Sequence, residues 1–268
     1  MSTSHATPAR EDALAPAAYD AFAPFYDVFT AHEDYEWWWS ALLPLAEAAG
    51  LAGNRVLDVA CGTGKSLAPL LARGWSGVGV DVSAGMLAEA RRKLGSHVKL
   101  VACDMRDLPV LGEFDLVCCL NDAVNHLHDE QQLTAAFMGF RRNLAPGGVV
   151  VFDVMTIHMF RTYGALVHQE PDRVLVVEGH GRDPLEQGAP LRVDFIVLER
   201  RDGSWSCVRT PHVQRHHPDA EVRRALHTAG LELVEVRGQS LRVLDALDEL
   251  SDERAVYVAR AVPCSSGD

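Results

Sequence analysis

The feature that most constrains this 268-residue chain is the alternation of short apolar runs with helix-like runs between residues 55 and 154. The apolar runs have the length of strands, and the segments between them repeat apolar residues every three or four positions. We expect strands at 55–60, 77–82, 98–102, 114–120 and 149–154, and helices at 65–72, 84–94 and 129–144. Buried strands joined through helices form a parallel sheet covered on both faces, so the sequence predicts an α/β fold.

The segments before and after this alternation have different residue patterns. Aromatic residues recur at helical spacing in residues 17–52, which predicts a helical cap. Trp37, Trp38 and Trp39 are consecutive and cannot share one helix face, so we expect at least one of them, with Trp38 as the candidate, to face a substrate pocket. Beyond residue 155 we expect an antiparallel insert with strands at 173–177, 191–198 and 205–212, then a helix at 219–229 and strands at 231–236 and 255–261.

The predicted organisation has five parts. They are a disordered tail (1–16), the helical cap (17–52), a cofactor-binding core (53–155), a strand insert that covers the substrate (156–217) and the end of the core sheet (218–268).

Composition limits the partners. Lys and Arg number 25 against 37 Asp and Glu, so the net charge is −12, and phosphate backbones and anionic lipid are repelled. No apolar run approaches the roughly 18 residues of a membrane span, and residues 1–17 lack the apolar stretch of a signal peptide. The six cysteines form no CxxC motif. We therefore expect a cytoplasmic protein with reduced cysteines, a small-molecule partner and neither a nucleic-acid nor a membrane partner.

A glycine motif follows the first strand and opens the first helix of the core. Gly62 and Gly64 allow a ligand to approach the backbone closely because no Cβ intervenes. Asp81 ends the next strand, 19 residues after Gly62, where a carboxylate can accept from both hydroxyls of a ribose. Asp104 ends the third strand, where it can accept from an adenine amino group. These positions predict a nucleoside site at the carboxyl edge of the sheet.

Five segments in order resemble the class I S-adenosylmethionine-dependent methyltransferases. They are VLDVACGTG (56–64), GVDVSAGML (79–87), ACDMRDLP (102–109), FDLVCCLNDAVNHL (114–127) and LAPGGVVVFDV (144–154). The resemblance implies a seven-stranded Rossmann-like sheet, S-adenosylmethionine as donor and S-adenosylhomocysteine as product. It places these residues around the cofactor: Tyr26, Asp58, Ala60 and Gly62 at the methionyl end, Asp81 at the ribose, Met86, Asp104 and Met105 at the adenine, and Leu120 beside the sulfonium. Gly64 and Val82 are further expected cofactor contacts.

Within that family the chain is similar to amino-sugar N,N-dimethyltransferases and related small-molecule tailoring enzymes. The similarity implies N- or O-methylation of a secondary metabolite or amino sugar by a monomer or homodimer. Residues 154–164, VMTIHMFRTYG, depart from the Trp-rich segment of those enzymes, which leaves the acceptor open. A non-catalytic adenosylmethionine-binding module is an alternative. A NAD-dependent oxidoreductase is another, but it would need a third glycine where Leu67 stands.

The candidate chemistry follows the fourth strand. His126 is the candidate general base, because an imidazole titrates near neutral pH; a packing or capping role is its alternative. Tyr26 is the second catalytic candidate. Asn121 and Asp122 lie on the same loop, and Arg161 and His216 lie further on; together with Trp38 they are candidate substrate contacts. His216 and His217 are neighbours that point opposite ways on a strand, so no metal site is expected.

Overall fold

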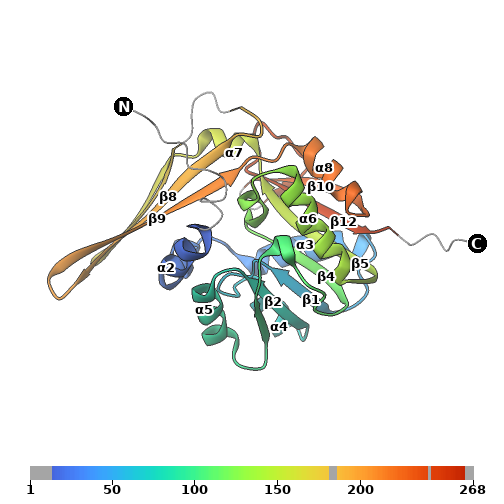
Figure 1. The fold of residues 1–268 in the computed structure, drawn as a ribbon, viewed down its shortest axis with the longest axis horizontal. Helices are drawn as coiled ribbons and strands as arrows, with labels where there is room; N and C mark the ends of the chain where they lie inside the picture. Colours follow the sequence, from blue (N-terminus) through green and yellow to red (C-terminus); the bar gives the residue numbers. More distant parts are fainter. Residues whose placement is uncertain (1–13, 181–185, 241–242, 263–268) are drawn as a thin grey trace, which may run out of the picture.

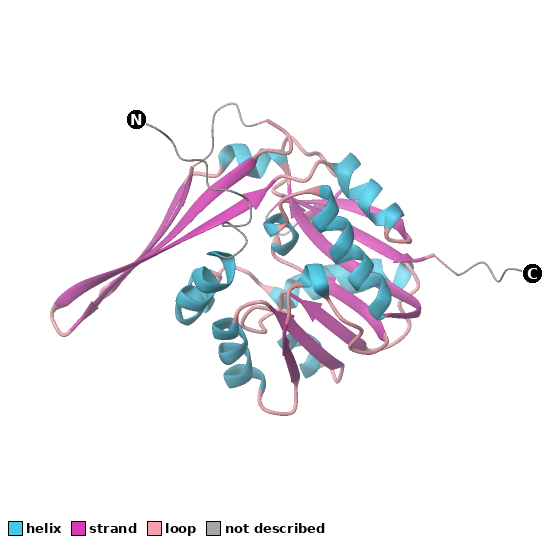
Figure 2. Cartoon of the chain, viewed as in Figure 1, coloured by secondary structure: helices cyan, strands magenta, loops and turns pink. Residues whose placement is uncertain are grey.

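The computed structural model describes residues 14–180, 186–240 and 243–262. Figures 1 and 2 show a large sheet flanked by helices and a second sheet that extends away from it. The strands of the large sheet are β1 (Arg55–Val59), β2 (Ser76–Asp81), β3 (Lys99–Ala102), β4 (Phe114–Cys119), β5 (Leu144–Met155), β10 (Leu231–Ser240), β11 (Val243–Asp245) and β12 (Arg254–Ala261). The α-helices are α2 (Leu14–Phe29), α3 (Tyr35–Ala48), α4 (Leu67–Ala72), α5 (Ala84–Leu94), α6 (Glu130–Asn143), α7 (Ile157–Thr162) and α8 (Asp219–Thr228).

The order of the large sheet is β11-β10-β12-β5-β4-β1-β2-β3. The five predicted core strands are parallel neighbours, and β12 runs antiparallel between β5 and β10. The predicted seven-stranded α/β sheet is therefore confirmed, with the short β11 as an eighth strand at its edge. Because β1, β2, β3 and β4 end at one edge, the loops after them lie close together, as expected for a ligand site of an open parallel sheet.

Side chains that start the predicted helices cap them in the structure. Ser83 accepts a hydrogen bond from the Met86 amide at the start of α5, and Asp129 accepts one from the Gln132 amide at the start of α6. These caps fix the loops that precede the helices. The core then packs on both faces of the sheet: Phe137 and Phe140 of α6 lie on one face, and a second cluster under α3 lies on the other.

The three tryptophans of α3 are mainly packing residues. Trp39 is fully buried and its indole Nε1 donates to the Ser66 carbonyl at 2.7 Å. Trp38 is 4% exposed, and its Nε1 donates to Glu33 Oε2 at 3.2 Å. Trp37 is half-buried. Their contacts thus place Trp38 in the core, and its role as a substrate contact stays a prediction.

The insert has one strand more than the sequence predicted. Its antiparallel sheet is β6-β7-β8-β9, formed by Ala165–Glu170, Arg173–Gly179, Pro190–Arg201 and Ser204–Arg215. β6 was missed because residues 165–170 show no alternation of polar and apolar residues, and nearly all of them are exposed. The helix α7 was missed as well. The long β8–β9 ribbon extends well beyond the large sheet (Figure 1).

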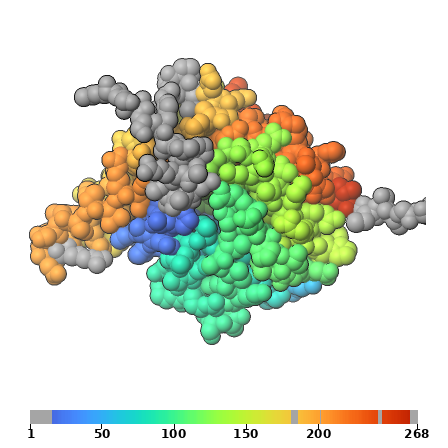
Figure 3. Space-filling model, in the orientation of Figure 1, coloured from blue at the N-terminus to red at the C-terminus, as the bar shows by residue number. Residues whose placement is uncertain are grey.

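The N-terminal helix α2 lies between the insert and the core. Figure 3 shows its blue surface between the orange surface of β8–β9 and the teal surface of α5. α2 starts at Leu14, so residues 14–16, which we expected in the disordered tail, are helical. Residues 1–13 lie outside the described part. Cys264 also lies outside it, and the other five cysteines are free. No helix in the described ranges is both long and apolar enough to cross a membrane.

Candidate functional site

The loop after β1 adopts a left-handed backbone at three predicted cofactor residues. The φ angles are +58° at Ala60, +53° at Gly62 and +77° at Gly64. Ala60 accepts a conformation that non-glycine residues rarely adopt, which is common at functional sites. A Cβ at Gly64 would lie 2.6 Å from Leu94 Cδ1 of α5, so glycine is required there for packing against a helix. Gly62 has no such obstruction.

Asp81 joins the glycine loop to the loop after β2. Its Oδ2 accepts from the Gly62 amide at 2.8 Å, and its Oδ1 accepts from the Ser83 amide at 2.8 Å. The residue is 8% exposed, and burial raises its pKa to about 6 although these hydrogen bonds oppose the change. Each carboxylate oxygen keeps a further acceptor position, so Asp81 can organise the loop and still accept from ribose hydroxyls.

Asp58 lies beneath the glycine loop. It is 1% exposed, and it accepts from Ser66 Oγ at 2.5 Å and from Cys118 Sγ at 3.5 Å. Burial raises its pKa to about 7, against the effect of the two hydrogen bonds. In this structure Asp58 therefore supports the loop from within the core.

The other residues expected to contact the cofactor differ in exposure. Met86 is 1% exposed, Leu120 is 5% exposed, and Met105 is half-buried against the core, whereas Val82 is 40% exposed. The Asp104 carboxylate is already held by Arg106, whose Nη2 donates to Oδ2 at 2.6 Å. Burial raises the pKa of Asp104, but the hydrogen bonds and charge of Arg106 outweigh burial and lower it. Sequence reasoning missed this competing partner of Asp104.

Helix α2 is tied to both cofactor loops by side chains. Asp20 accepts from Ser83 Oγ at 2.6 Å, and Asp27 accepts from Thr63 Oγ1 at 2.5 Å. The ring of Tyr26 lies 3.8 Å from the position of a Gly62 Cβ. The predicted placement of Tyr26 beside the glycine loop thus agrees with the geometry.

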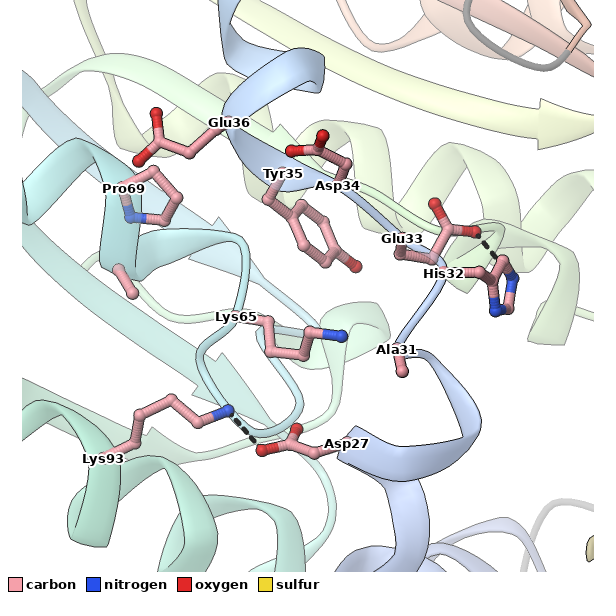
Figure 4. A pocket seen from close by; sticks show the side chains of 11 residues that line it. Asp27, Ala31, His32, Glu33, Asp34, Tyr35, Glu36, Lys65, Pro69 and Lys93 are labelled. Atoms are coloured by element: carbon pink, nitrogen blue, oxygen red, sulfur yellow. Dashed lines mark ion pairs between the residues drawn. The ribbon is translucent and has the colours of Figure 1, made fainter.

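An open depression of about 600 Å³ lies beside this junction, between the α2–α3 connection and the start of α4. Figure 4 shows Lys65 pointing into it and Lys93 at its border, paired with Asp27 at 2.7 Å. Lys65 Nζ donates to the Thr30 carbonyl and hydroxyl oxygens at 2.5 and 3.0 Å. Both lysines thus fasten α2 to the core.

His126 faces α2 and the insert. Its Nε2 lies 2.8 Å from the Tyr19 hydroxyl, and its ring also hydrogen-bonds the Val213 backbone. Burial, followed by the charge of His128, lowers the pKa of His126 to about 4, so the imidazole is neutral at pH 7. The structure therefore adds Tyr19, 107 positions earlier in the chain, which sequence reasoning missed.

A second histidine adjoins this pair. The His212 ring centroid lies 4.5 Å from that of Tyr19 and 6.2 Å from that of His126. His212 is 2% exposed, its Nδ1 has no hydrogen-bond partner, and burial lowers its pKa to about 3. Tyr19 and His126, both half-buried, and the buried His212 form an aromatic cluster where α2, the β4 loop and the insert meet.

Asn121 and Asp122 follow β4, and their backbone is left-handed in both residues, with φ of +65° and +55°. Asn121 Nδ2 donates to the Tyr26 hydroxyl at 3.1 Å, which joins this loop to the donor side of the site. Asp153 and Arg254 bind the same loop, and neither was a predicted site residue. The one available signal was a carboxylate inside the apolar run 149–154.

The remaining candidate substrate contacts are His216 and Arg161. His216 is 1% exposed and its Nδ1 accepts from the Gly188 amide at 3.2 Å, so it is buried, and its role as a substrate contact stays a prediction. Arg161 is exposed on α7. His217 Nδ1 lies 2.7 Å from Glu221 Oε1. Across the described residues, no group of three or more His, Cys, Asp or Glu side chains is arranged to hold a metal ion.

Comparisons with known proteins agree with this architecture. The family of the methyltransferase domain matches residues 56–148. A putative methyltransferase of Geobacillus sp. (strain WCH70) is 31% identical over 250 residues, which cover 90% of this chain and 99% of the relative. A methyltransferase structure from Clostridium acetobutylicum, described as S-adenosylmethionine-dependent, superposes with a TM-score of 0.76 over 91% of this chain and 99% of that chain, at 22% identity.

A narrower match concerns the dTDP-3-amino-3,4,6-trideoxy-α-D-glucopyranose N,N-dimethyltransferase of Streptomyces venezuelae, which is 33% identical over 133 residues. That alignment covers 49% of this chain and 56% of the enzyme. The match to a putative methyltransferase of Bacillus subtilis likewise spans just over half of that protein, 55%.

The sheet order, with the glycine loop and Asp81 at the carboxyl ends of the parallel strands, defines an open α/β protein with a Rossmann-like core. With the relative that matches along nearly its whole length, the chain belongs to the S-adenosylmethionine-dependent methyltransferases. The family that the five sequence segments predicted is confirmed, and the oxidoreductase alternative is wrong.

Proposed function

We propose that this protein transfers a methyl group from S-adenosylmethionine to a small molecule, on nitrogen or oxygen, with an amino sugar as the first candidate. The observation that carries the proposal is the contact of Tyr26 with both halves of the site: its ring covers Gly62, and its hydroxyl accepts from Asn121. The donor loop and the β4 loop therefore meet at one side chain. The name of the Streptomyces relative supports an amino-sugar acceptor.

The bound donor supplies an electrophilic methyl group on a sulfonium. The Asp81 carboxylate would accept from its ribose hydroxyls, and the exposed Val82 and buried Met86 would flank the adenine. The Asp104 carboxylate would accept a hydrogen bond from the adenine amino group either while it also binds Arg106 or after Arg106 has released it. What the protein contributes to an in-line displacement is mainly alignment and the exclusion of water.

The proton of the acceptor can leave through Tyr19 and His126. With the His126 ring bonded to the Val213 backbone, its Nε2 accepts the Tyr19 hydroxyl proton. The Tyr19 oxygen can then accept a proton from the acceptor. Burial raises the pKa of Tyr26 well above its usual range, so Tyr26 remains a neutral hydroxyl. The general base predicted at His126 thus acts through Tyr19 in this proposal.

The test is a turnover screen with isotopically labelled donor. Amines, alcohols and carboxylic acids, including a dTDP-linked amino sugar, are incubated with the protein and the products are identified by mass. Calorimetry with S-adenosylhomocysteine is run on the same preparation. Tight binding with labelled methyl in an amine or alcohol product supports the proposal. Binding without turnover on any acceptor would favour the non-catalytic module, and absence of binding would contradict both.

A further inference from the structure

The loop after β4 is strained at two consecutive residues. Asn121 and Asp122 both have positive φ, and neither is glycine. This conformation is unfavourable for residues with a Cβ and persists only where the surroundings hold it. The side chains that hold this backbone conformation therefore indicate the function of the loop.

Two residues from neighbouring strands hold the loop. Asp153 of β5 is fully buried and accepts from the Asn121 amide at 2.6 Å and the Asp122 amide at 2.9 Å. Arg254 of β12 donates through Nη1 to Asp122 Oδ1 and Asp153 Oδ2, each at 2.9 Å. Its Nη2 donates to Asn121 Oδ1 at 3.0 Å. Backbone and side chains of both loop residues are thus fixed by one carboxylate and one guanidinium.

Other elements complete the arrangement. Gln214 of β9 donates to Asp122 Oδ2 at 2.6 Å. Glu33, in the α2–α3 connection, accepts from Arg254 Nη2 at 3.1 Å. The charge of Asp122 is also one cause, after burial, of the raised pKa values of Tyr19 and Tyr26. The neighbouring Asn121 donates to the Tyr26 hydroxyl at 3.1 Å, so Asp122 lies next to the residue that joins this loop to the glycine loop.

The charges of this cluster do not balance. Glu33, Asp122 and Asp153 pair with the single guanidinium of Arg254. Side-chain exposure is 13%, 17%, 0% and 14%, in that order. Among the described residues the other ion pair of these carboxylates is the exposed His32, 3.7 Å from Glu33. Three carboxylates thus share one guanidinium in a setting where water screens their charges poorly.

We propose that Arg254 is a positioning residue of the acceptor site, and that the Asp122 carboxylate it holds selects an acceptor that binds as a cation, such as a protonated amine. The amine gives up its proton through Tyr19 to His126 before its lone pair attacks the methyl group. The proposal rests on the proposed methyltransferase function and narrows its acceptor. A cation beside Asp122 neutralises part of the buried excess charge, whereas an alcohol leaves it in place and a carboxylate adds to it. The same charge favours a cation at the position of the transferred methyl.

The test uses two probes that differ in charge at that position and need no acceptor. Sinefungin carries an amino group where the donor carries its S-methyl, and S-adenosylhomocysteine is neutral there. Calorimetry at pH 8 gives the ratio of their dissociation constants for the wild type, Asp122→Asn and Asp122→Gly. The glycine variant removes the carboxylate and adopts a left-handed backbone without penalty, so it keeps the loop if the asparagine variant does not fold.

We expect the wild type to bind sinefungin about 10-fold more tightly than S-adenosylhomocysteine, within the range of a charge-assisted hydrogen bond. Either Asp122 variant should remove most of that preference while changing affinity for S-adenosylhomocysteine less than about 3-fold. If neither probe binds the wild type, the proposed function itself fails. If both bind and the ratio is the same in the variants, the function stands and this proposal is overturned.

Arg254→Lys tests positioning, because a lysine keeps the charge but cannot form the fork of hydrogen bonds. Arg260→Lys is the matched control on the same strand, where Arg260 pairs with Glu232 at the surface. We expect Arg254→Lys to lose several-fold in the sinefungin preference and to lower kcat for an amine acceptor at least 10-fold, with S-adenosylhomocysteine affinity retained. Equal losses for both probes, or results like those of Arg260→Lys, would contradict a positioning role.

Discussion

Replacing Asp81 with asparagine tests the donor site most directly. The carboxylate accepts from the Gly62 and Ser83 amides, each at 2.8 Å, and it has capacity left for ribose hydroxyls. Asparagine keeps one side-chain oxygen but loses the charge. A hydrogen bond to a charged group contributes about 1.5–3 kcal/mol, so affinity for S-adenosylhomocysteine should fall about 10- to 150-fold. An alanine at this position would also leave the Gly62 and Ser83 amides without their acceptor, so a loss of affinity could not be separated from a loss of folding stability.

The raised pKa of Asp81 adds a pH signature. In the free protein the pKa is about 6, so about a tenth of the carboxyl groups are ionised at pH 5 and about nine tenths at pH 7. Ribose hydroxyls bind the ionised form, so affinity should rise up to about 10-fold from pH 5 to pH 7, with release of a proton. The free energy of unfolding depends on pH in the opposite direction. Because the pKa of Asp81 is raised in the folded protein, Asp81 stabilises the fold fully below about pH 4, and this stabilisation is lost as pH rises through about 6.

The assay is calorimetry with S-adenosylhomocysteine at pH 5, 6 and 7 on the wild type, Asp81→Asn and the surface control Glu89→Gln on α5. Asp58, with a pKa of about 7, also titrates near the loop, so the difference between wild type and Asp81→Asn isolates Asp81. Unchanged affinity in Asp81→Asn, or the same pH dependence in both proteins, would refute the placement of the ribose at this carboxylate.

The other predictions concern catalysis, stability and partners. His126→Ala should lower the single-turnover rate about 10²- to 10⁴-fold, with partial rescue at higher pH, and Tyr19→Phe should lower it too; near-normal turnover in a stable His126→Ala protein would end the proton-transfer proposal. The acid limb of the rate attributable to His126 should lie near pH 4, not near 6.5. Asp58→Asn should raise the melting temperature at pH 8 more than at pH 5, because the stability that the raised Asp58 pKa contributes is lost as pH rises through about 7. Phe137→Ala, which empties a fully buried site beside Phe152, should lower the free energy of unfolding by about 3–5 kcal/mol in a denaturant titration. With a net charge of −12, the protein should not shift DNA or RNA in a gel at moderate salt; tight, salt-sensitive binding would oppose a small-molecule acceptor.

The core sheet and the donor loop could be predicted because both depend on local patterns. Strand runs alternate with helical runs, and the side chains that cap α5 and α6 stand directly before them. The positions of Gly62 and Asp81 follow from the same order, since parallel strands end at one edge. The exposed strand β6 escaped prediction for the converse reason: it buries neither face, so its sequence has no period to detect.

By itself, then, the sequence determined the family and the succession of core strands along the chain, because both depend on patterns among neighbouring residues. Tertiary structure alone decided the acceptor side. Tyr19 meets His126 across 107 positions because α2 packs between the core and the insert. Arg254 reaches Asp122 across 132 positions because β12 enters the sheet antiparallel beside β5, with Arg254 opposite Met155. No local period encodes such pairings, which arise only when strands and helices from opposite ends of the chain pack together.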